Sequence, residues 1–258
     1  MFLKYLDLHN KILRDAADPD KVAQELVDNG YYVVGVNSHN DGSEVKNKEQ
    51  YYRFFETHFE IFEKKGLLML PAVEIKIRDG DYSALQGLID EFSRKYIPVG
   101  HRGEVHHVPF LIFVHGGIAE ANTITCRDAK ADLLCHPEKD GGVLTAGNAS
   151  DAAQNDVGIE VNYREYRFSE EKDNHKERVM DTIAKVKKAG GRLFLFSATI
   201  KEGELVHIKE LVDYGKALHE DLVDESIRNV HELLMAKYGK LLEKTHYNLD
   251  AMKERHGV

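Results

Sequence analysis

Short apolar runs alternate with longer amphipathic segments along most of the chain, and this alternation restricts the possible folds more than any other feature. Runs of about five or more residues rich in Val, Ile, Leu, Phe or Tyr are typical of strands. The runs are Phe2–Leu8, Tyr32–Asn37, Leu67–Ile77, Phe110–His115, Ala131–Cys135, Val157–Asn162 and Arg192–Ser197. Strands that are separated by helices need crossover connections, which predict a mainly parallel sheet.

Helical patterns fill the segments between these runs. The first has Asp18 as its expected N-cap, Pro19 at the first helical position and Gly30 just beyond its end. The expected helices are Pro19–Asn29, Lys48–Lys65, Ser83–Tyr96, Ala119–Asp128, Ala146–Asn155, His175–Ala189 and Glu204–Leu218. About seven strand–helix units predict an α/β fold, a distorted TIM-like (β/α)7 barrel. No Gly-x-Gly-x-x-Gly follows the first strand, which argues against a dinucleotide-binding fold.

Two segments fall outside this alternation. The polar, His-rich stretch Ile97–Val108 predicts an exposed loop or hairpin. After Asp221 an apolar stripe predicts one more helix, which packs either on the barrel or on a partner; the stripe is formed by Ile227, Val230, Leu234, Leu241 and Leu242. We therefore expect a barrel over residues 1–220 and a C-terminal helical extension over residues 221–258.

Composition excludes several classes of protein. No run approaches the roughly 20 apolar residues of a membrane span, and Asp7 and His9 interrupt any signal-peptide core, so we expect a cytoplasmic protein. Cys126 and Cys135 have the spacing of neither a disulfide framework nor a zinc knuckle, and Cys135 is expected to be buried. The net charge of −9 disfavours tight binding of nucleic acid by the chain alone.

The C-terminal ends of the expected strands carry polar side chains. In chain order these are Asp7 and His9, His39, Glu74, His115, His136, Glu160 with Asn162, and Ser197. Strand ends of an α/β barrel converge on one face, where ligands bind. Imidazole and carboxylate are ligands of Zn, Mn and Fe, and such ions can polarise a phosphate and generate hydroxide at neutral pH. Each histidine could instead be a hydrogen-bonded loop residue, and Asp7 could cap a turn.

Three further features admit two interpretations each. Glu74 lies in an apolar run, so its carboxylate needs a cation or a metal as partner. Gly116 and Gly117 would let the backbone approach a ligand, or would simply form a tight turn. Arg164 and Arg167 follow the sixth strand and could bind phosphate, or could pair with neighbouring acids. Neither a nucleophile elbow nor a P-loop is present, so nothing favours a serine hydrolase or an NTPase.

The ordered motifs YLDLH, NSHND, PAVEIK, FVHGG, LLCHPE, VGIEVN and FSAT resemble the polymerase and histidinol phosphatase (PHP) superfamily over residues 3–218. That resemblance implies a distorted seven-stranded barrel with a metal cluster at the strand ends. The segment FLIFVHGGIAEANTITCRDAKADLLCHPE resembles one branch more closely, the barrel-shaped protein subunit of archaeal and eukaryotic ribonuclease P. The matching positions are Val114–Gly117, Asn122 and Ala131–Pro137, and NDVGIEVNYREYR resembles the strand and arginine-bearing loop that come next.

The chain departs from the metal-dependent PHP pattern at both ends of the barrel. His9 is followed by Asn10 and Lys11 in place of His-x-His, and Ser197–Thr199 replaces Asp-x-His at the last strand. Both changes remove ligands from a multinuclear centre, which favours the ribonuclease P branch, where metal catalysis is lost. The acidic charge, and Thr123 in place of the usual arginine after Asn122, count against that branch.

Two functions follow as expectations from the resemblance. The first is a ribonuclease P subunit without its own active centre, which supports 5′ maturation of precursor tRNA. It would bind the ribonuclease P RNA through Arg164 and Arg167, together with a small protein subunit, and would need no metal cofactor. The alternative is a PHP phosphoesterase that acts on a small phosphorylated substrate and holds Zn, Mn or Fe on a reduced ligand set: His9, His39, Glu74, His115 and His136. A barrel with only a binding role is a third possibility.

Overall fold

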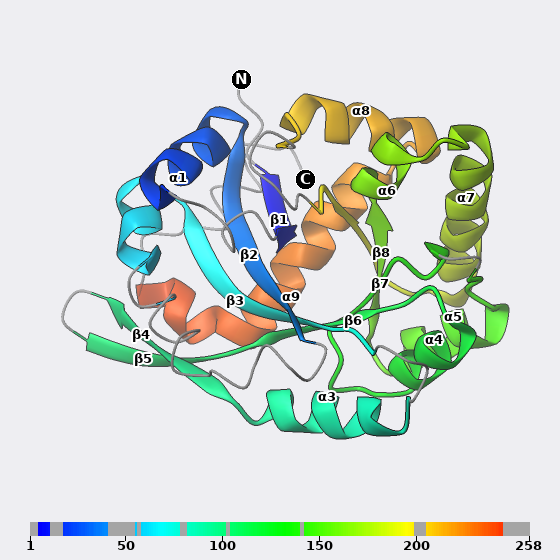
Figure 1. The fold of residues 1–258 in the computed structure, drawn as a ribbon, viewed down its shortest axis with the longest axis horizontal. Coiled ribbons are helices and arrows are strands. Elements are labelled where there is room, and N and C mark those ends of the chain that lie inside the picture. The colour runs from blue at the N-terminus through cyan, green and yellow to red at the C-terminus, as the bar shows by residue number, and fades with distance from the viewer. Residues whose placement is uncertain are drawn as a thin grey trace.

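The computed structural model describes residues 5–10, 18–40, 55, 58–77, 82–101, 104–139, 142–198 and 205–244. Its main feature is a curled parallel sheet of seven strands in the order β1-β2-β3-β6-β7-β8-β9 (Figure 1). The strands are β1 (Tyr5–Asn10), β2 (Tyr31–Asn40), β3 (Leu68–Ile75), β6 (Leu111–His115), β7 (Leu133–Cys135), β8 (Gly158–Asn162) and β9 (Leu193–Phe196). The predicted α/β class and all seven predicted strands are confirmed.

Helices connect the strands and cover the sheet. They are α1 (Pro19–Asp28), α3 (Leu85–Ser93), α4 (Ala119–Cys126), α5 (Ala146–Gln154), α6 (Tyr163–Phe168), α7 (Lys172–Ala189), α8 (Ile208–Leu218) and α9 (Leu222–Lys244), with a 3-10 turn at Tyr82–Ala84. The start of α1 follows the predicted chemistry, because the Asp18 side chain accepts hydrogen bonds from the backbone N–H groups of Asp20 and Lys21. The predicted helix Lys48–Lys65 lies partly outside the described residues. Within its described part, residues 55 and 58–64 are helical.

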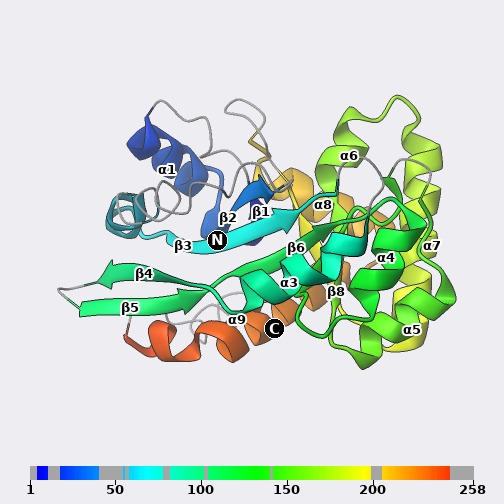
Figure 2. The same cartoon turned by 60° about the horizontal axis from the view of Figure 1, so that its bottom comes forward.

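The His-rich segment forms an antiparallel hairpin of β4 (Tyr96–His101) and β5 (Glu104–Pro109). Figure 2 shows this hairpin extending away from the main sheet, next to the C-terminal half of α9. The Tyr238 hydroxyl on α9 donates to the Pro109 carbonyl at the base of the hairpin. The prediction of a loop or hairpin here is therefore confirmed in its hairpin form.

The curled sheet has β1 and β9 as its outer strands, and among the described strands no ladder joins them. Helix α9 lies against both (Figure 1). Leu195 N–H donates to Ser226 Oγ at 2.8 Å, and Asn229 Nδ2 donates to the Leu193 carbonyl at 2.9 Å. Side chains of α9 thus form hydrogen bonds with backbone groups on the outer edge of β9, where a neighbouring strand would form them in a larger sheet. The C-terminal helix packs on its own sheet, which the sequence left open.

Two groups of buried apolar side chains lie on the sheet. One joins α1, β2, β3, β6 and α9, and the other joins α5, α7, α8, β8 and β9. Cys126 and Cys135 are both buried, as predicted for Cys135, and burial raises the pKa of Cys126 to about 12. In the described part of the chain, no helix is long and apolar enough to span a membrane.

Candidate functional site

The candidate site lies where the C-terminal ends of neighbouring strands β3, β6, β7 and β8 meet. Glu74 comes from β3, His115 ends β6, His136 directly follows β7, and Glu160 comes from β8. Glu74 and Glu160 are fully buried, and His136 is only 4% exposed. Parallel pairing brings these four side chains together, because it aligns the same ends of all four strands.

The four side chains form a chain of contacts between carboxylate and imidazole. His115 Nδ1 lies 2.5 Å from Glu74 Oε1, and His136 Nε2 lies 3.6 Å from the same oxygen. On its other side, His136 Nδ1 lies 3.4 Å from Glu160 Oε2. The two imidazole rings are 4.9 Å apart between centroids. Two imidazoles therefore contact the buried Glu74 carboxylate, which needs polar partners because it lies in an apolar strand.

Three of these residues also satisfy the geometry of a metal site. Glu74, His115 and His136 each place one potential ligand atom within 4.8 Å of the other two. Burial lowers the pKa of His136 to about 4, although Glu160 and Glu74 favour its protonated form. A neutral imidazole is the form that binds a metal ion.

The backbone is strained at the same end of the sheet. His136 has a φ of 49° and Ala198, just after β9, has a φ of 50°. Such left-handed conformations are uncommon for residues other than glycine and are concentrated at functional sites. At His136 the strained turn positions the imidazole between Glu74 and Glu160.

The glycine pair after β6 is explained by packing. A side chain on Gly116 would lie 2.6 Å from Asn122 Oδ1, and one on Gly117, whose φ is 92°, would lie 2.7 Å from the Lys139 carbonyl. Gly117 N–H donates to Asn122 Oδ1, and Asn122 Nδ2 donates to the Pro137 carbonyl. Asn122 therefore links the Gly–Gly turn to the loop that carries His136. This supports the tight-turn interpretation over close approach to a ligand.

A second group of buried polar side chains lies beside the histidines. Glu138 is 3% exposed, and within the described residues neither of its carboxylate oxygens has a hydrogen-bond partner. Burial is the main cause that raises its pKa to about 8; the carboxylates of Glu160 and Glu165 act in the same direction, while its own backbone N–H and Arg178 oppose them. Burial also raises the pKa of the Tyr214 phenol, and Glu138 is the next cause. A neutral carboxyl at Glu138 limits the cost of burying it at neutral pH.

The predicted site residues are partly brought together. Glu74, His115 and His136 form one cluster, as expected. His39 pairs in register with Glu74 through the backbones of β2 and β3, and His9 lies in β1. The side chains of His9 and His39 lie outside the described residues, so their predicted role as ligands remains a prediction.

Arg164 and Arg167 lie on α6, immediately after the strand that carries Glu160. Their guanidinium carbons lie 5.0 and 5.6 Å from the ring centre of Phe168. The adjacent acid Glu165 pairs with Lys139 at 2.9 Å.

Sequence reasoning did not select Glu138 or the contact between Glu160 and His136. Glu160 itself was named among the polar residues at the strand ends, but its contact with His136 was not predicted. Glu138 gave no signal, since it follows Pro137 in a segment that reads as an ordinary polar loop.

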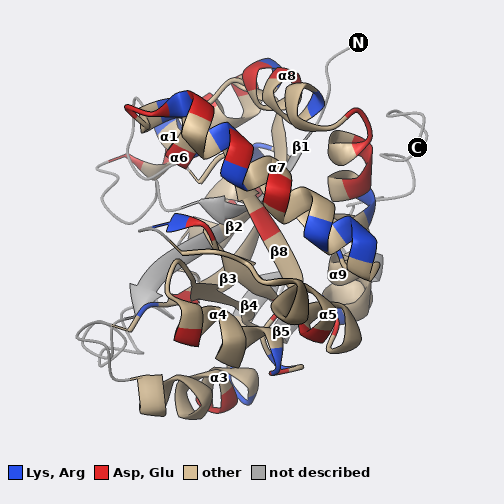
Figure 3. Cartoon of the chain, turned by 90° about the vertical axis from the view of Figure 1, so that its right-hand side faces the viewer, with Lys and Arg blue, Asp and Glu red and all other residues tan. Residues whose placement is uncertain are grey.

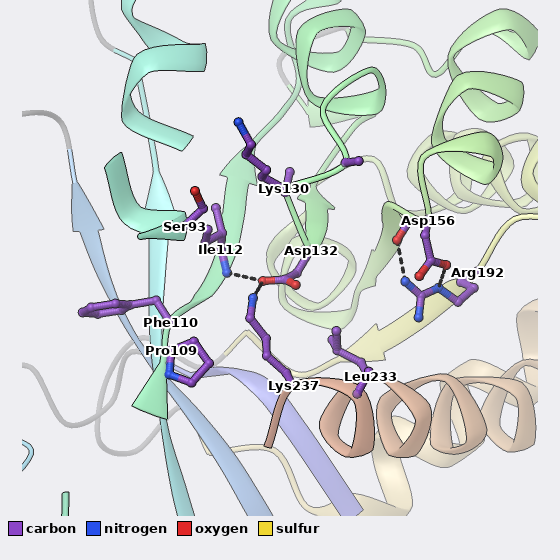
Figure 4. A pocket seen from close by; sticks show the side chains of 13 residues that line it. Ser93, Pro109, Phe110, Ile112, Lys130, Asp132, Asp156, Arg192, Leu233 and Lys237 are labelled. Atoms are coloured by element: carbon purple, nitrogen blue, oxygen red, sulfur yellow. Dashed lines mark hydrogen bonds and ion pairs between the residues drawn. The ribbon is translucent and has the colours of Figure 1, made fainter. Parts of the chain in front are cut away.

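A cavity of about 330 Å³ lies at the opposite end of the strands (Figure 4). Its charged side chains are all engaged: Asp132 Oδ2 accepts from Lys237 Nζ and from the Ile112 N–H at 2.6 Å, Arg192 Nε lies 2.9 Å from Asp156 Oδ1, and Lys130 pairs with Asp90 outside the cavity. These pairs fasten α9 and the strand starts to each other. We assign this cavity a structural role.

No family model matches the chain, and no curated protein matches it either. Among solved structures, the fold is similar to a chain of the "cryo-EM structure of archaeal Ribonuclease P with mature tRNA". The TM-score is 0.66 with 17% sequence identity, and the match covers 94% of this chain and 94% of that chain. At this identity the similarity establishes a shared fold.

Proposed function

We propose that this protein is a subunit of a ribonuclease P and supports 5′ maturation of precursor tRNA, while RNA supplies the catalysis. The observation that carries the proposal is the fold similarity over 94% of both chains to a component of an archaeal ribonuclease P structure. The resemblance of FVHGG and LLCHPE to the same family supports it independently. Asn122, which ties these two motifs together, gives that resemblance a structural reason.

In this proposal the curled sheet is a distorted PHP-type barrel that has become a scaffold. At the last strand, where metal-dependent PHP members carry ligands, this chain has Ser197 and Ala198. Partners would be the ribonuclease P RNA and a small protein subunit, with Arg164 and Arg167 in contact with RNA. The partner would supply much of the positive charge, because this chain carries −9.

The test is reconstitution. The purified chain, a ribonuclease P RNA and the small protein subunit are mixed, and RNA binding and cleavage of precursor tRNA are measured. We expect the chain to bind the RNA together with its partner and to raise the cleavage rate. If it does neither, the proposal fails.

A metal-dependent phosphoesterase is the second candidate, and the cluster of Glu74, His115 and His136 favours it. One carboxylate and two imidazoles fit Zn, Mn or Fe. A bound ion would polarise a phosphoryl oxygen of a small phosphorylated substrate. In this candidate Glu74 Oε1, held 2.5 Å from His115 Nδ1, fixes the orientation of that ring.

Elemental analysis before and after mild chelation, followed by a phosphatase screen with added manganese or zinc, tests this second candidate. His115→Gln then separates the two candidates. The scaffold proposal expects His115→Gln protein that is folded to support cleavage of precursor tRNA as the wild type does, whereas the enzyme proposal expects loss of bound metal and of phosphatase activity. His107→Gln, an exposed position on the hairpin, is the matched control.

A further inference from the structure

Helix α6 ends in an exposed aromatic ring flanked by two arginines. Phe168 is 52% exposed, although a phenyl ring gains free energy when it is buried. Arg164 lies 5.0 Å and Arg167 lies 5.6 Å from the centre of its ring. We call these three residues the α6 platform.

The platform is firmly attached to the molecule. Asn162 Oδ1 accepts from the Glu165 N–H at 3.1 Å and so caps the start of α6. On the inner side of the helix, Tyr163 and Tyr166 pack on Tyr214 with ring centres 5.0 and 4.6 Å apart. None of these contacts involves Phe168, so its half-exposed ring can be replaced while they remain in place.

Exposed aromatic rings beside guanidinium groups suit one kind of ligand especially well. An unstacked nucleobase gains free energy by stacking on a ring or on an arginine plane, while the arginines reach the adjacent phosphates. From this chemistry we propose that the α6 platform binds an unpaired nucleotide of single-stranded RNA, with Phe168 as the stacking surface. The inference rests on the proposed ribonuclease P function and specifies how the chain would hold RNA.

The surroundings limit the size of this contact. Three acids, Glu170, Glu171 and Asp173, follow the platform at the start of α7. They repel phosphates, so the platform holds one or two nucleotides and does not track a long strand. Because α6 directly follows β8, the bound nucleotide would lie at the strand end that also carries Glu160.

The chain contains no tryptophan, which allows a direct test. Phe168→Trp places the only tryptophan of the chain on the platform and keeps a ring that can stack. Met180→Trp is the matched control, because Met180 is 45% exposed and lies on α7, outside the platform. Short unstructured oligouridylate is titrated into each full-length variant. We expect the fluorescence of the first variant to be quenched and that of the second to be unchanged.

Affinity provides the second readout. Phe168→Leu keeps an apolar side chain but removes the ring, and it should weaken binding of fluorescein-labelled oligouridylate about tenfold. Equal affinity of Phe168→Leu and the wild type, without quenching at position 168, overturns the platform while leaving the ribonuclease P proposal standing. Wild-type protein that binds no oligouridylate also overturns it. The reconstitution described above decides the ribonuclease P proposal separately.

Discussion

Glu74 is the residue on which the candidate site depends most. Its carboxylate is fully buried and contacts His115 and His136. Removing one member of a buried cluster leaves the polar groups of the others buried without a partner. The loss of folding stability is then larger than the net stability that the intact cluster contributes. If the protein is a scaffold, these contacts link β3, β6 and β7. If it is an enzyme, the same side chains would be the metal ligands.

Substitution of Glu74 should therefore reduce stability even without metal. Glu74→Ala is expected to lower the free energy of unfolding by about 3 kcal/mol, because the two histidines lose their shared acceptor. Glu74→Gln keeps an acceptor oxygen and should cost less. Urea denaturation at pH 7 with chelator present measures both variants. An unchanged midpoint for Glu74→Ala would show that the contacts with His115 and His136 do not support the fold.

His175 should make stability depend on pH. Burial lowers the pKa of His175, Arg178 lowers it further, and Glu165 opposes both. The unfolded chain, in which histidine has a pKa of about 6.5, thus binds the proton more readily than the folded protein. The stability from neutral His175 is fully present above about pH 6.5 and is lost as the pH falls toward the lower folded pKa.

The experiment compares thermal or urea unfolding between about pH 5 and 7 for wild type and His175→Gln. We expect stability to fall with decreasing pH less steeply in the variant. His107→Gln, at an exposed position of the hairpin, should keep the wild-type slope. Identical slopes for wild type and His175→Gln would contradict the assignment.

At the scale of secondary-structure elements, hydrophobic periodicity predicted the strands to within a few residues. Buried parallel strands are nearly continuous apolar runs, so β3 and β8 stand out in the sequence. The apolar stripe of α9 was also predicted, and Ile227, Val230 and Leu234 are buried. The side chain of Leu241 lies outside the described residues.

The polar contacts of α9 could not be predicted. Ser226 and Asn229 interrupt the apolar stripe and read as solvent-facing residues, yet both are buried against β9. Their role becomes visible only when β9 is known to be an outer strand of the described sheet, so that its second edge faces α9. A residue's own polarity does not reveal whether a distant strand needs its hydrogen bond.

Loss of one of these contacts should loosen α9 from the sheet. Asn229→Ala leaves the buried Leu193 carbonyl without its donor and should destabilise the protein by about 1–3 kcal/mol. Arg228→Ala, an exposed neighbour on the same helix, should change stability by no more than about 0.5 kcal/mol. Urea denaturation followed by circular dichroism compares the two. Equal effects would mean that the hydrogen bond from Asn229 is not needed.

At the scale of the whole molecule, topology explains why part of the site was predictable. Parallel strands place all their C-terminal ends on one edge, so Glu74, His115 and His136 could be expected to meet without knowledge of any side-chain contact. The strained turn at His136 and the burial of Glu138 depend on how individual loops pack, and sequence periodicity carries no information about that. The contribution of α9 at the outer strands belongs to the same class of tertiary effect.

Under the proposed function, net charge limits how strongly this chain can bind RNA. The chain has 44 acidic and 35 basic side chains, and Figure 3 shows both kinds interspersed along α7. Because its net charge is −9, the chain alone should bind ribonuclease P RNA weakly. A basic partner subunit should strengthen binding at least about tenfold, because it contributes phosphate contacts.

Salt dependence isolates the contribution of this chain to that complex. Each phosphate contact with single-stranded RNA adds about −0.7 to the slope of log affinity against log salt concentration. Substituting both Arg164 and Arg167 by Gln should therefore reduce the magnitude of the slope by about 1 to 2 in the presence of the partner. Arg94→Gln serves as the control, because this exposed arginine on the C-terminal side of α3 pairs with Asp90. A slope unaffected by the double substitution would place the RNA contact elsewhere on the molecule, and a slope reduced equally by Arg94→Gln would mean that only overall charge matters.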